Sequence, residues 1–354
     1  MYFLKLILRF FCISIYLVSH ASHSTNIGVY YYPGWKKPKI DAWSKIKNYP
    51  EREPILGWYR EGESNITKDH LKWMRKYGVD FVVYDWYWDK KSGVENRTYA
   101  IDSYLKNSQG AGVKFAILWA NHTGTPESIE QFDKIVDYWI EHYFTNKNYE
   151  QYEGKPVVYI FSPQSLAKDA AAFKSTPNEL LNRARDKALK AGLKGLYFVG
   201  SVDANEDAII TKLPNDTYDA LSAYNYHVGV EQGTGKLVKM SKNYGELTAG
   251  YKWTWEFILK NSKLPYIIPV TSGWDRRPWG GSADPEHDES YSTPDQFYNH
   301  LLDAKYMLTA NPNKTIDTVI ICCWNEYGEG SYIEPTKKYG FSYLEKISEV
   351  FKDK

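Results

Sequence analysis

The chain has 354 residues, of which 43% are hydrophobic and 25% are charged, and its formal net charge is +1. These values are ordinary for a soluble globular protein, and the length allows two average domains or one large α/β barrel. No basic surplus points to nucleic acid or to an anionic membrane, so neither is expected as a partner.

Aromatic residues make up 16% of the chain, mostly as 31 Tyr and 13 Trp. One interpretation is an aromatic-rich core. The other is a carbohydrate site, because rings with one polar edge stack on the C–H faces of sugars and also hydrogen-bond hydroxyl groups. Composition leaves both open.

The N-terminus has the pattern of a secretory signal peptide. Lys5 and Arg9 precede a short apolar run at residues 10–18, and residues 19–21 offer the small side chains that a signal peptidase reads. The run is shorter than the roughly 20 residues of a transmembrane helix. We expect a signal at residues 1–21 with cleavage near Ala21, an exported (secreted or periplasmic) protein and no integral membrane span after cleavage; an uncleaved anchor is the alternative.

Three cysteines are present, and Cys12 falls within the predicted signal. Cys322 and Cys323 are adjacent, and because a bridge between neighbours is strained, we expect two buried thiols. The sequence contains no CxxC pair and no HExxH motif, so no metal site or cofactor is expected.

The rest of the chain alternates strand-like and helix-like segments. Eight apolar, β-branched and aromatic segments predict buried strands at residues 27–33, 80–88, 114–122, 155–163, 195–202, 220–227, 266–275 and 318–326. Helical patterns predict helices at residues 67–78, with Thr67 as N-cap, and at 126–144, 176–192, 244–261 and 293–308.

Eight strand–helix units without a linker predict one α/β domain, residues 26–354, folded as a (β/α)₈ TIM barrel. A doubly wound sheet is the main alternative, but no GxGxxG follows the first strand. Long loops after strands 1 and 7, residues 36–65 and 276–292, follow carboxyl ends of strands, so they should wall the active-site cleft.

Polar and aromatic residues collect where the predicted strands end, as a barrel active site requires. The predicted substrate-binding residues are Tyr32, Asp85, Trp86, Asn121, His122, Tyr226, Trp274, Asp275, Trp324 and Asn325. Amides, carboxylates and flat rings suit a sugar, and the absence of a glycine-rich phosphate loop disfavours a nucleotide. Structural roles are the alternative: Asp85 could cap a helix or pair with an arginine, and His122 could be a loop histidine.

The segment "WNEYGEG", residues 324–330, carries Glu326 and Glu329 directly after an apolar strand. Two carboxylates in one pocket should have pKa values pushed apart, which supplies an acid and a base near neutral pH. Glycosidases use such a pair. Gly328 and Gly330 would allow a tight turn that aims both at one centre. Glu326 and Glu329 are therefore the predicted catalytic residues, and a solvated acidic turn is the alternative.

The segment "WNEYGEGSYIEP", residues 324–335, resembles the C-terminal motif of glycoside hydrolase family 99 and its WbsX-like relatives. The segments "YYYPGW", "GVDFVVYDWYW" and "TSGWDRRP" are similar to the same proteins, so the resemblance extends from about Ile27 to the C-terminus. It implies a (β/α)₈ barrel and a retaining glycosidase without metal or organic cofactor. Family 99 members are endo-acting α-mannosidases.

The resemblance also implies a mechanism in which the 2-hydroxyl of the substrate attacks the anomeric carbon through a 1,2-anhydro sugar. Carried over, Glu326 deprotonates that hydroxyl and Glu329 protonates the leaving oxygen. This chain departs from the mannosidases at strand 3. They carry a histidine–isoleucine–glutamate–proline segment there, whereas residues 118–122 read "LWANH", with no glutamate, and the WbsX-like branch is closer on this point. An α-mannan substrate and endo action therefore do not follow.

Three functions remain as hypotheses: an exported glycoside hydrolase acting on an oligo- or polysaccharide, a glycosyltransferase of surface polysaccharide synthesis, and a non-catalytic carbohydrate-binding barrel. Nucleotide sugars are made in the cytoplasm, so the predicted signal disfavours the transferase. Both glutamates are present, which disfavours a mere binding module. The hydrolase is the preferred interpretation, with a carbohydrate as its partner and a monomer as its expected state.

Overall fold

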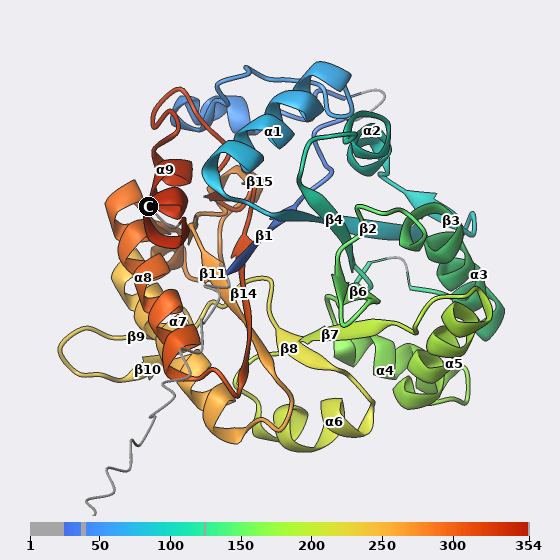
Figure 1. The fold of residues 1–354 in the computed structure, drawn as a ribbon. Helices are drawn as coiled ribbons and strands as arrows, with labels where there is room; N and C mark the ends of the chain where they lie inside the picture. Colours follow the sequence, from blue (N-terminus) through green and yellow to red (C-terminus); the bar gives the residue numbers. More distant parts are fainter. Residues whose placement is uncertain (1–24, 37–39, 124, 353–354) are drawn as a thin grey trace, which may run out of the picture.

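A computed structural model describes residues 25–36, 40–123 and 125–352. Eight parallel strands follow each other in the order β1-β14-β11-β8-β7-β6-β4-β2, and β2 pairs with β1 to close the barrel. Helices surround the barrel, with α7 to α9 on one side and α3 to α5 on the other (Figure 1). The predicted (β/α)₈ fold is confirmed, whereas the predicted signal peptide lies outside the described residues.

All eight predicted strands are present. The barrel strands are β1 (Asn26–Tyr31), β2 (Phe81–Asp89), β4 (Lys114–Trp119), β6 (Lys155–Ile160), β7 (Tyr197–Ser201), β8 (Ala220–Ser222), β11 (Tyr266–Thr271) and β14 (Thr315–Cys322). Several predicted segments run past the observed strand end, because the polar and aromatic residues that follow each strand belong to the loops that form the upper face.

The helices of the described chain are α1 (Ser64–Tyr77), α2 (Tyr99–Asn107), α3 (Ile129–Trp139), α4 (Pro163–Ala172), α5 (Pro177–Lys190), α6 (Leu213–Asn215), α7 (Tyr244–Asn261), α8 (Pro294–Ala310) and α9 (Ser342–Phe351). α3 continues into a π-helical turn, η3 (Ile140–Phe144), and a second one, η4 (Ala208–Lys212), precedes α6. None of these helices is long and apolar enough to cross a membrane.

Helix starts follow the capping chemistry of the sequence in two cases and depart from it in one. α5 and α8 begin with full capping boxes at Thr176 and Thr293, each with a proline in the first turn. The prediction of Thr67 as an N-cap is wrong, because α1 begins at Ser64. The Thr67 hydroxyl instead donates to the Glu63 carbonyl inside the first turn, at 3.3 Å.

The barrel interior is packed with aromatic side chains. Tyr30 lies edge-on to Tyr159, with ring centroids 5.9 Å apart, and packs against Tyr224 at 4.8 Å. Many of the largest fully buried side chains are tryptophans, among them Trp119, Trp139 and Trp255. Much of the aromatic content therefore serves the core, as the first interpretation of the composition held.

Both long loops lie over the carboxyl ends of the barrel strands. The first contains η1 (Ile46–Asn48) and η2 (Pro50–Arg52), and the second contains β12 (Gly273–Trp274), η5 (Arg277–Trp279), η6 (Pro285–Glu289) and β13 (Ser290–Tyr291). The first loop has its own apolar cluster, formed by Trp35, Trp43, Ile46, Tyr59, Ile66 and Tyr327. This cluster fixes the loop on the barrel without extending the main core.

Short hairpins complete the fold. β3 (Val94–Asn96) pairs with the end of β2, β5 (Gln151–Tyr152) pairs with β6, and β9 (Gly229–Val230) pairs with β10 (Leu237–Val238). After β14, β15 (Asn325–Glu326) pairs with β16 (Ser331–Tyr332). The segment that carries the two predicted catalytic acids is thus a β-hairpin at the top of the barrel.

Candidate active site

A cavity of about 370 Å³ opens at the carboxyl ends of the barrel strands. It is lined by Tyr32, Asp85, Tyr87, Arg97, Ala120, His122, Thr123, Phe161, Tyr224, Asn225, His227, Trp274, Trp279, Glu326 and Glu329. Three carboxyl groups, several flat rings and an amide thus meet in one space. This is the combination that a site for a hydroxyl-rich ligand requires.

Both predicted catalytic acids reach this cavity from the strand-8 hairpin. The β15–β16 pairing sets Glu326 opposite Ser331, and the Glu329 N–H donates to the Glu326 carbonyl at 3.1 Å. Gly330 has φ +72°, and a Cβ there would lie 2.7 Å from the Asp275 nitrogen. A Cβ on Gly328 would enter the Trp279 indole. Gly330 is thus required by the backbone, and Gly328 by packing.

The hairpin is fastened to the end of β1. The Asn325 side chain accepts from the Tyr32 N–H at 2.9 Å and donates to the Tyr32 carbonyl at 3.1 Å. The Trp35 indole N–H donates to the Asn325 carbonyl at 3.0 Å, and the Trp324 N–H donates to the Tyr30 carbonyl at 2.7 Å. Because both the oxygen and the nitrogen of its amide bond the Tyr32 backbone, Asn325 positions the hairpin.

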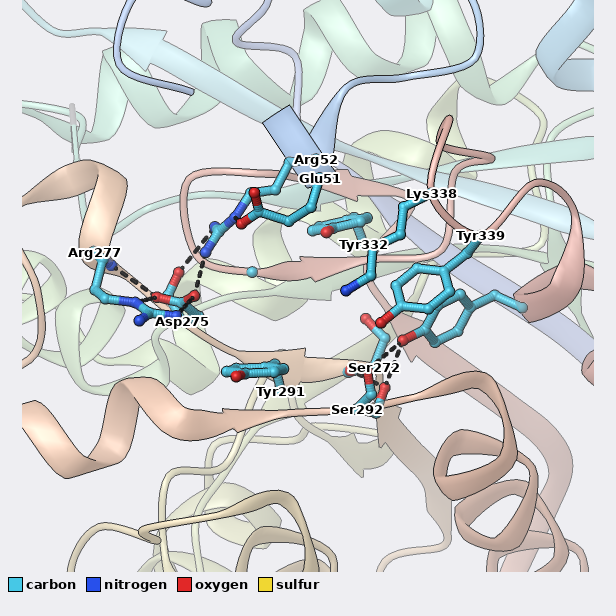
Figure 2. Close-up of a pocket in the computed structure, with 12 residues that line it drawn as sticks. Glu51, Arg52, Ser272, Asp275, Arg277, Tyr291, Ser292, Tyr332, Lys338 and Tyr339 are labelled. Carbon is cyan, nitrogen blue, oxygen red and sulfur yellow. Dashed lines mark hydrogen bonds and ion pairs between the residues drawn. The ribbon is translucent and has the colours of Figure 1, made fainter. Parts of the chain in front are cut away.

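Arg52, from the first long loop, ties the strand-7 and strand-8 loops together. It is buried, pairs with the Asp275 carboxylate, and donates to the carbonyls of Asp275 at 3.1 Å and Tyr327 at 2.7 Å. Arg277 also binds the Asp275 carboxylate, at 2.6 and 2.8 Å. Figure 2 shows both arginines on Asp275, beside a separate cavity of about 230 Å³. Asp275 is therefore a structural residue of the loops and does not line the main cavity.

The acids of the main cavity are held in an unfavourable environment for charge. Burial raises the pKa of Glu326 well above its usual value, and the charges of Glu329 and Asp85 raise it further. Burial raises the pKa of Glu329 to about 7, against a lowering by Arg276. The pKa of Asp85 is raised by burial and by Glu329. At neutral pH the three groups cannot all be ionised.

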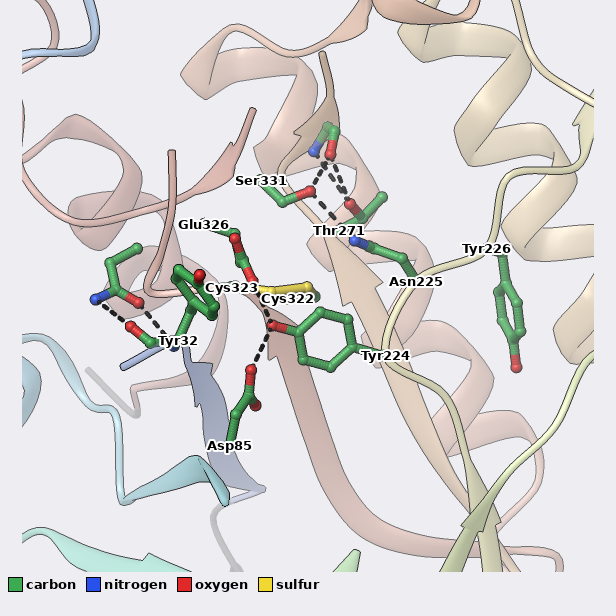
Figure 3. The surroundings of a disulfide bond; sticks show 12 residues. Tyr32, Asp85, Tyr224, Asn225, Tyr226, Thr271, Cys322, Cys323, Glu326 and Ser331 are labelled. Carbon is green, nitrogen blue, oxygen red and sulfur yellow. Dashed lines mark hydrogen bonds between the residues drawn. A yellow bond between two sulfur atoms is a disulfide. The ribbon is translucent and has the colours of Figure 1, made fainter. Parts of the chain in front are cut away.

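The Tyr224 hydroxyl joins two of these acids. Its oxygen lies 3.1 Å from Asp85 Oδ2 and 3.2 Å from Glu326 Oε1 (Figure 3). A phenol has one proton, so both contacts are hydrogen bonds only if one carboxyl group is protonated and donates to the phenol oxygen. The other oxygens, Asp85 Oδ1 and Glu326 Oε2, are buried and find no partner within the described part of the chain.

The structure brings half of the predicted site residues to the cavity: Tyr32, Asp85, His122, Trp274, Glu326 and Glu329. It does not bring Asp275 and Asn325, described above, nor four others: Trp86, Asn121, Tyr226 and Trp324. Successive side chains of a strand point to opposite faces, so neighbours of cavity residues fall into other layers.

Each of these four has a clear structural role. Trp86 packs edge-on against Trp139, with ring centroids 5.3 Å apart. The Asn121 amide bonds the N–H and the carbonyl of Ser162, both at 2.8 Å. The Tyr226 hydroxyl pairs with that of Tyr266 at 2.7 Å, and Trp324 is fully buried. All four stabilise the barrel rim below or beside the cavity.

Several lining residues were not among the predicted site residues: Tyr87, Arg97, Ala120, Thr123, Phe161, Tyr224, Asn225, His227 and Trp279. Tyr224, Asn225 and His227 follow the sixth strand, so their strand-end position was an available signal. Arg97 comes from the β3 hairpin and Trp279 from the second long loop. Neither position follows from a strand pattern.

Cys322 and Cys323, at the end of β14, are both buried, as expected. The expectation of two thiols is wrong, however, because the two sulfurs form a disulfide, which lies beneath the hairpin that carries Glu326 (Figure 3). In the described residues no group of three or more His, Cys, Asp or Glu side chains is arranged to hold a metal ion.

Fold and site together define a glycoside-hydrolase-like TIM barrel. Residues 47–347 match the family described as Glycosyltransferase WbsX, and the chain belongs to this family. No curated protein is detectably similar to the chain.

Among solved structures, a glycoside hydrolase-like protein matches with a TM-score of 0.66 at 16% identity, covering 94% of this chain and 95% of the other. The GH99 endo-α-mannosidase from Bacteroides thetaiotaomicron matches with a TM-score of 0.60 at 18% identity, over 92% and 96% of the two chains. A family 1 β-glucosidase from Thermotoga maritima matches with a TM-score of 0.54 at 13% identity, over 94% and 99%. At these identities the matches show a shared fold.

Proposed function

We propose that the protein is an exported, retaining glycoside hydrolase that acts on an oligo- or polysaccharide. The observation that carries the proposal is the pair Glu326 and Glu329, which one hairpin presents to one cavity where burial raises both pKa values. Elevated carboxyl pKa values in a cleft are typical of acid–base catalysis. The fold shared with the GH99 endo-α-mannosidase supports the same reaction class.

Glu329 is the proposed general acid. A pKa of about 7 leaves a large fraction of this group protonated at neutral pH, and proton transfer is most efficient when the pKa lies near the working pH. Glu326 is the proposed base. Protonated Asp85 would donate to the Tyr224 oxygen and Tyr224 to Glu326, which stabilises the ionised form of Glu326.

The proposed reaction has two steps. Glu326 takes the proton of the sugar 2-hydroxyl, O2 bonds to the anomeric carbon, and the glycosidic bond breaks while Glu329 protonates the leaving oxygen. Water then attacks the anomeric carbon of the 1,2-anhydro sugar, and the bond from this carbon to O2 breaks. Glu329 accepts a proton from this water, and Glu326 returns its proton to O2. Two inversions give net retention, and both acids can come from one hairpin because neither is the nucleophile.

The substrate is defined only in part by the cavity. An α-mannoside is one proposal, but at the end of β4 the lining consists of Ala120, His122 and Thr123 in place of a glutamate. The family description favours a glycosyltransferase as second candidate. Three acids face the cavity, and among the described residues Arg97 is the only Lys or Arg in its lining, so a nucleotide diphosphate would meet net repulsion.

The decisive experiment is a screen of purified protein against a glycan panel, with product masses measured in H₂¹⁸O. Hydrolysis would add one ¹⁸O to each new reducing end, and NMR of the first product would show the retained anomer. A parallel arm supplies nucleotide sugars with acceptor glycans. Transfer in that arm without hydrolysis in the other would overturn the proposal, as would absence of turnover in both with binding retained.

A further inference from the structure

His227 lies at the cavity wall and begins a chain of hydrogen bonds that ends on a backbone carbonyl. His227 Nδ1 is 3.1 Å from His287 Nε2, and His287 Nδ1 is 2.9 Å from the Ser241 carbonyl oxygen and 3.1 Å from the Ser241 hydroxyl. His287 and Ser241 are buried, with 1% and 0% exposure. Both histidines belong to loops above the barrel, so the chain links the cavity to the outer loop layer.

The direction of each hydrogen bond follows from the last acceptor. A carbonyl oxygen can only accept, so His287 Nδ1 carries the proton of that ring. Burial lowers the pKa of His287, and burial together with His287 lowers the pKa of His227 to about 4, so both rings are neutral at pH 7. His287 Nε2 is then a lone pair, His227 Nδ1–H donates to it, and His227 Nε2 is left as an acceptor.

The surroundings hold this arrangement in place. The His227 ring packs edge-on against Trp274, with ring centroids 4.3 Å apart, and the Trp274 indole N–H donates to the Ser282 hydroxyl at 2.9 Å. The nearby charges of Asp284 and Asp288 act on His287, and they raise its pKa without overcoming burial. Among the hydrogen bonds of the described residues the His227 side chain takes part only through Nδ1, which leaves Nε2 for a ligand in the cavity that the residue lines.

The geometry points to His227 as a specificity-determining residue: its Nε2 accepts a hydrogen bond from a substrate hydroxyl, and His287 acts as a positioning residue that fixes the tautomer. The identification of the ligand as a glycan rests on the proposed function. The site would then select a sugar unit with a free hydroxyl at this position. It would discriminate against a deoxy, O-methyl, sulfated or carboxylated unit there, because none of these offers the same donor.

The first test is independent of activity. Long-range ¹H–¹⁵N NMR of the full chain with ¹⁵N-labelled histidine, assigned with His227→Gln and His287→Gln variants, reports which nitrogen carries each proton. We expect both rings to be neutral at pH 7 with the proton on Nδ1. A proton on His227 Nε2 would overturn the inference whether or not the protein is a hydrolase. His287→Phe should release His227 to the Nε2–H tautomer, whereas Ser241→Ala, which keeps the carbonyl, should not.

The second test uses the glycan identified in the screen and its monodeoxy analogues. For one analogue, kcat/KM of the wild type should fall at least tenfold, and His227→Phe should remove this preference. His287→Phe should raise KM for the parent glycan about tenfold with a smaller change in kcat. If every deoxy analogue is discriminated equally by wild type and His227→Phe, the inference is wrong while the hydrolase assignment stands. If no glycan is turned over, only the proposed function fails.

Discussion

Acidic side chains line a cavity at each end of the barrel, but the residues around them differ. At the amino ends of the strands a cavity of about 620 Å³, larger than the one above, is lined by Asp80, Glu150 and Lys114 among others. Lys114 pairs with Glu150 at 3.1 Å, the Asn26 amide donates to Glu150 at 3.1 Å, and Asp80 accepts from the Ile27 N–H at 2.9 Å. Burial raises the pKa of Glu150 and of Asp80 as well, but Lys114 lowers both, so these two acids are partly compensated.

At the upper end the compensation is weaker, because Arg97 and Arg276 lower the pKa values of these acids only from beyond ion-pair distance. Within the described residues Asp85, Glu326 and Glu329 form no ion pair, and Asp85 Oδ1 and Glu326 Oε2 are buried without a partner. The nearby cations and donors, and not cavity size, distinguish the two places. Poorly compensated acids reduce stability, so their accumulation at one end of the barrel supports the proposed role in proton transfer.

The difference between the two ends of the barrel can be tested most directly by neutralising one acid at each end. Glu326→Gln and Glu329→Gln should each lower kcat/KM at least 10³-fold, because each removes a group that transfers a proton in the transition state. Glu150→Gln at the lower end should change kcat/KM less than twofold. Wild-type turnover of an activated glycoside by Glu326→Gln would refute its role.

The leaving group separates the two roles further. A nitrophenyl leaving group needs little protonation when it departs. With a nitrophenyl glycoside, Glu329→Gln should therefore recover most of the rate of the first step, which would appear as a burst of nitrophenol. Glu326→Gln should show no burst. Circular dichroism and melting profiles like those of the wild type would confirm that both variants are folded.

The next effect concerns what holds the upper end together. Arg52→Met removes a buried cation that bonds two loop carbonyls and pairs with Asp275, so it should lower the free energy of unfolding by about 3–5 kcal/mol. The matched control is Arg183→Met, which breaks the pair with Asp133 on the outer surface and should cost below about 1 kcal/mol. Equal urea midpoints for the two variants would contradict the structural role of Arg52.

The barrel itself could be predicted from the sequence because its strands are buried on both faces. Segments such as residues 155–160 are nearly continuous apolar runs, and helix caps such as Thr176 are local signals. Boundaries were less predictable. Thr67 looked like an N-cap, but the three residues before it also accept helical geometry and extend α1 to Ser64.

The sequence predicted where the site lies better than it predicted which residues line it. Strand-end position identified Asp85, His122, Trp274 and the two glutamates, because chain order alone places these ends on one face. It could not tell which of two neighbouring side chains faces the cavity, so Trp86 was chosen over Tyr87. Strand-end position also could not predict that Asp275 forms ion pairs with Arg52 and Arg277, since these contacts depend on loop conformation.

A smaller effect, on the pH dependence of kcat/KM, is expected when Tyr224 is replaced. Its hydrogen bond lowers the pKa of Glu326, so Tyr224→Phe should raise that pKa. A base acts when it is ionised, and the acidic limb of kcat/KM should therefore move to higher pH, by about one unit, with roughly tenfold lower kcat/KM on that limb. The alkaline limb, set by protonated Glu329 with its pKa of about 7, should stay in place. A shift of both limbs together would mean that Tyr224 acts on the whole cavity and not on Glu326.

The last effect is on stability and has the opposite sign to the effect on activity. The pKa of Glu329 is about 7 in the folded protein against an ordinary 4.5, so the folded state binds the proton more tightly than the unfolded state does. This contribution to stability is complete below about pH 4.5 and is lost as the pH rises through 7. Glu329→Gln removes the titration. Its free energy of unfolding relative to the wild type should therefore increase by on the order of 1–3 kcal/mol between pH 5 and pH 8, as measured by urea unfolding.

The exposed Glu141→Gln should show no such change. A constant difference for Glu329→Gln across this range would mean that Glu329 is solvated like an ordinary surface acid, and the contrast between the two ends of the barrel would not hold.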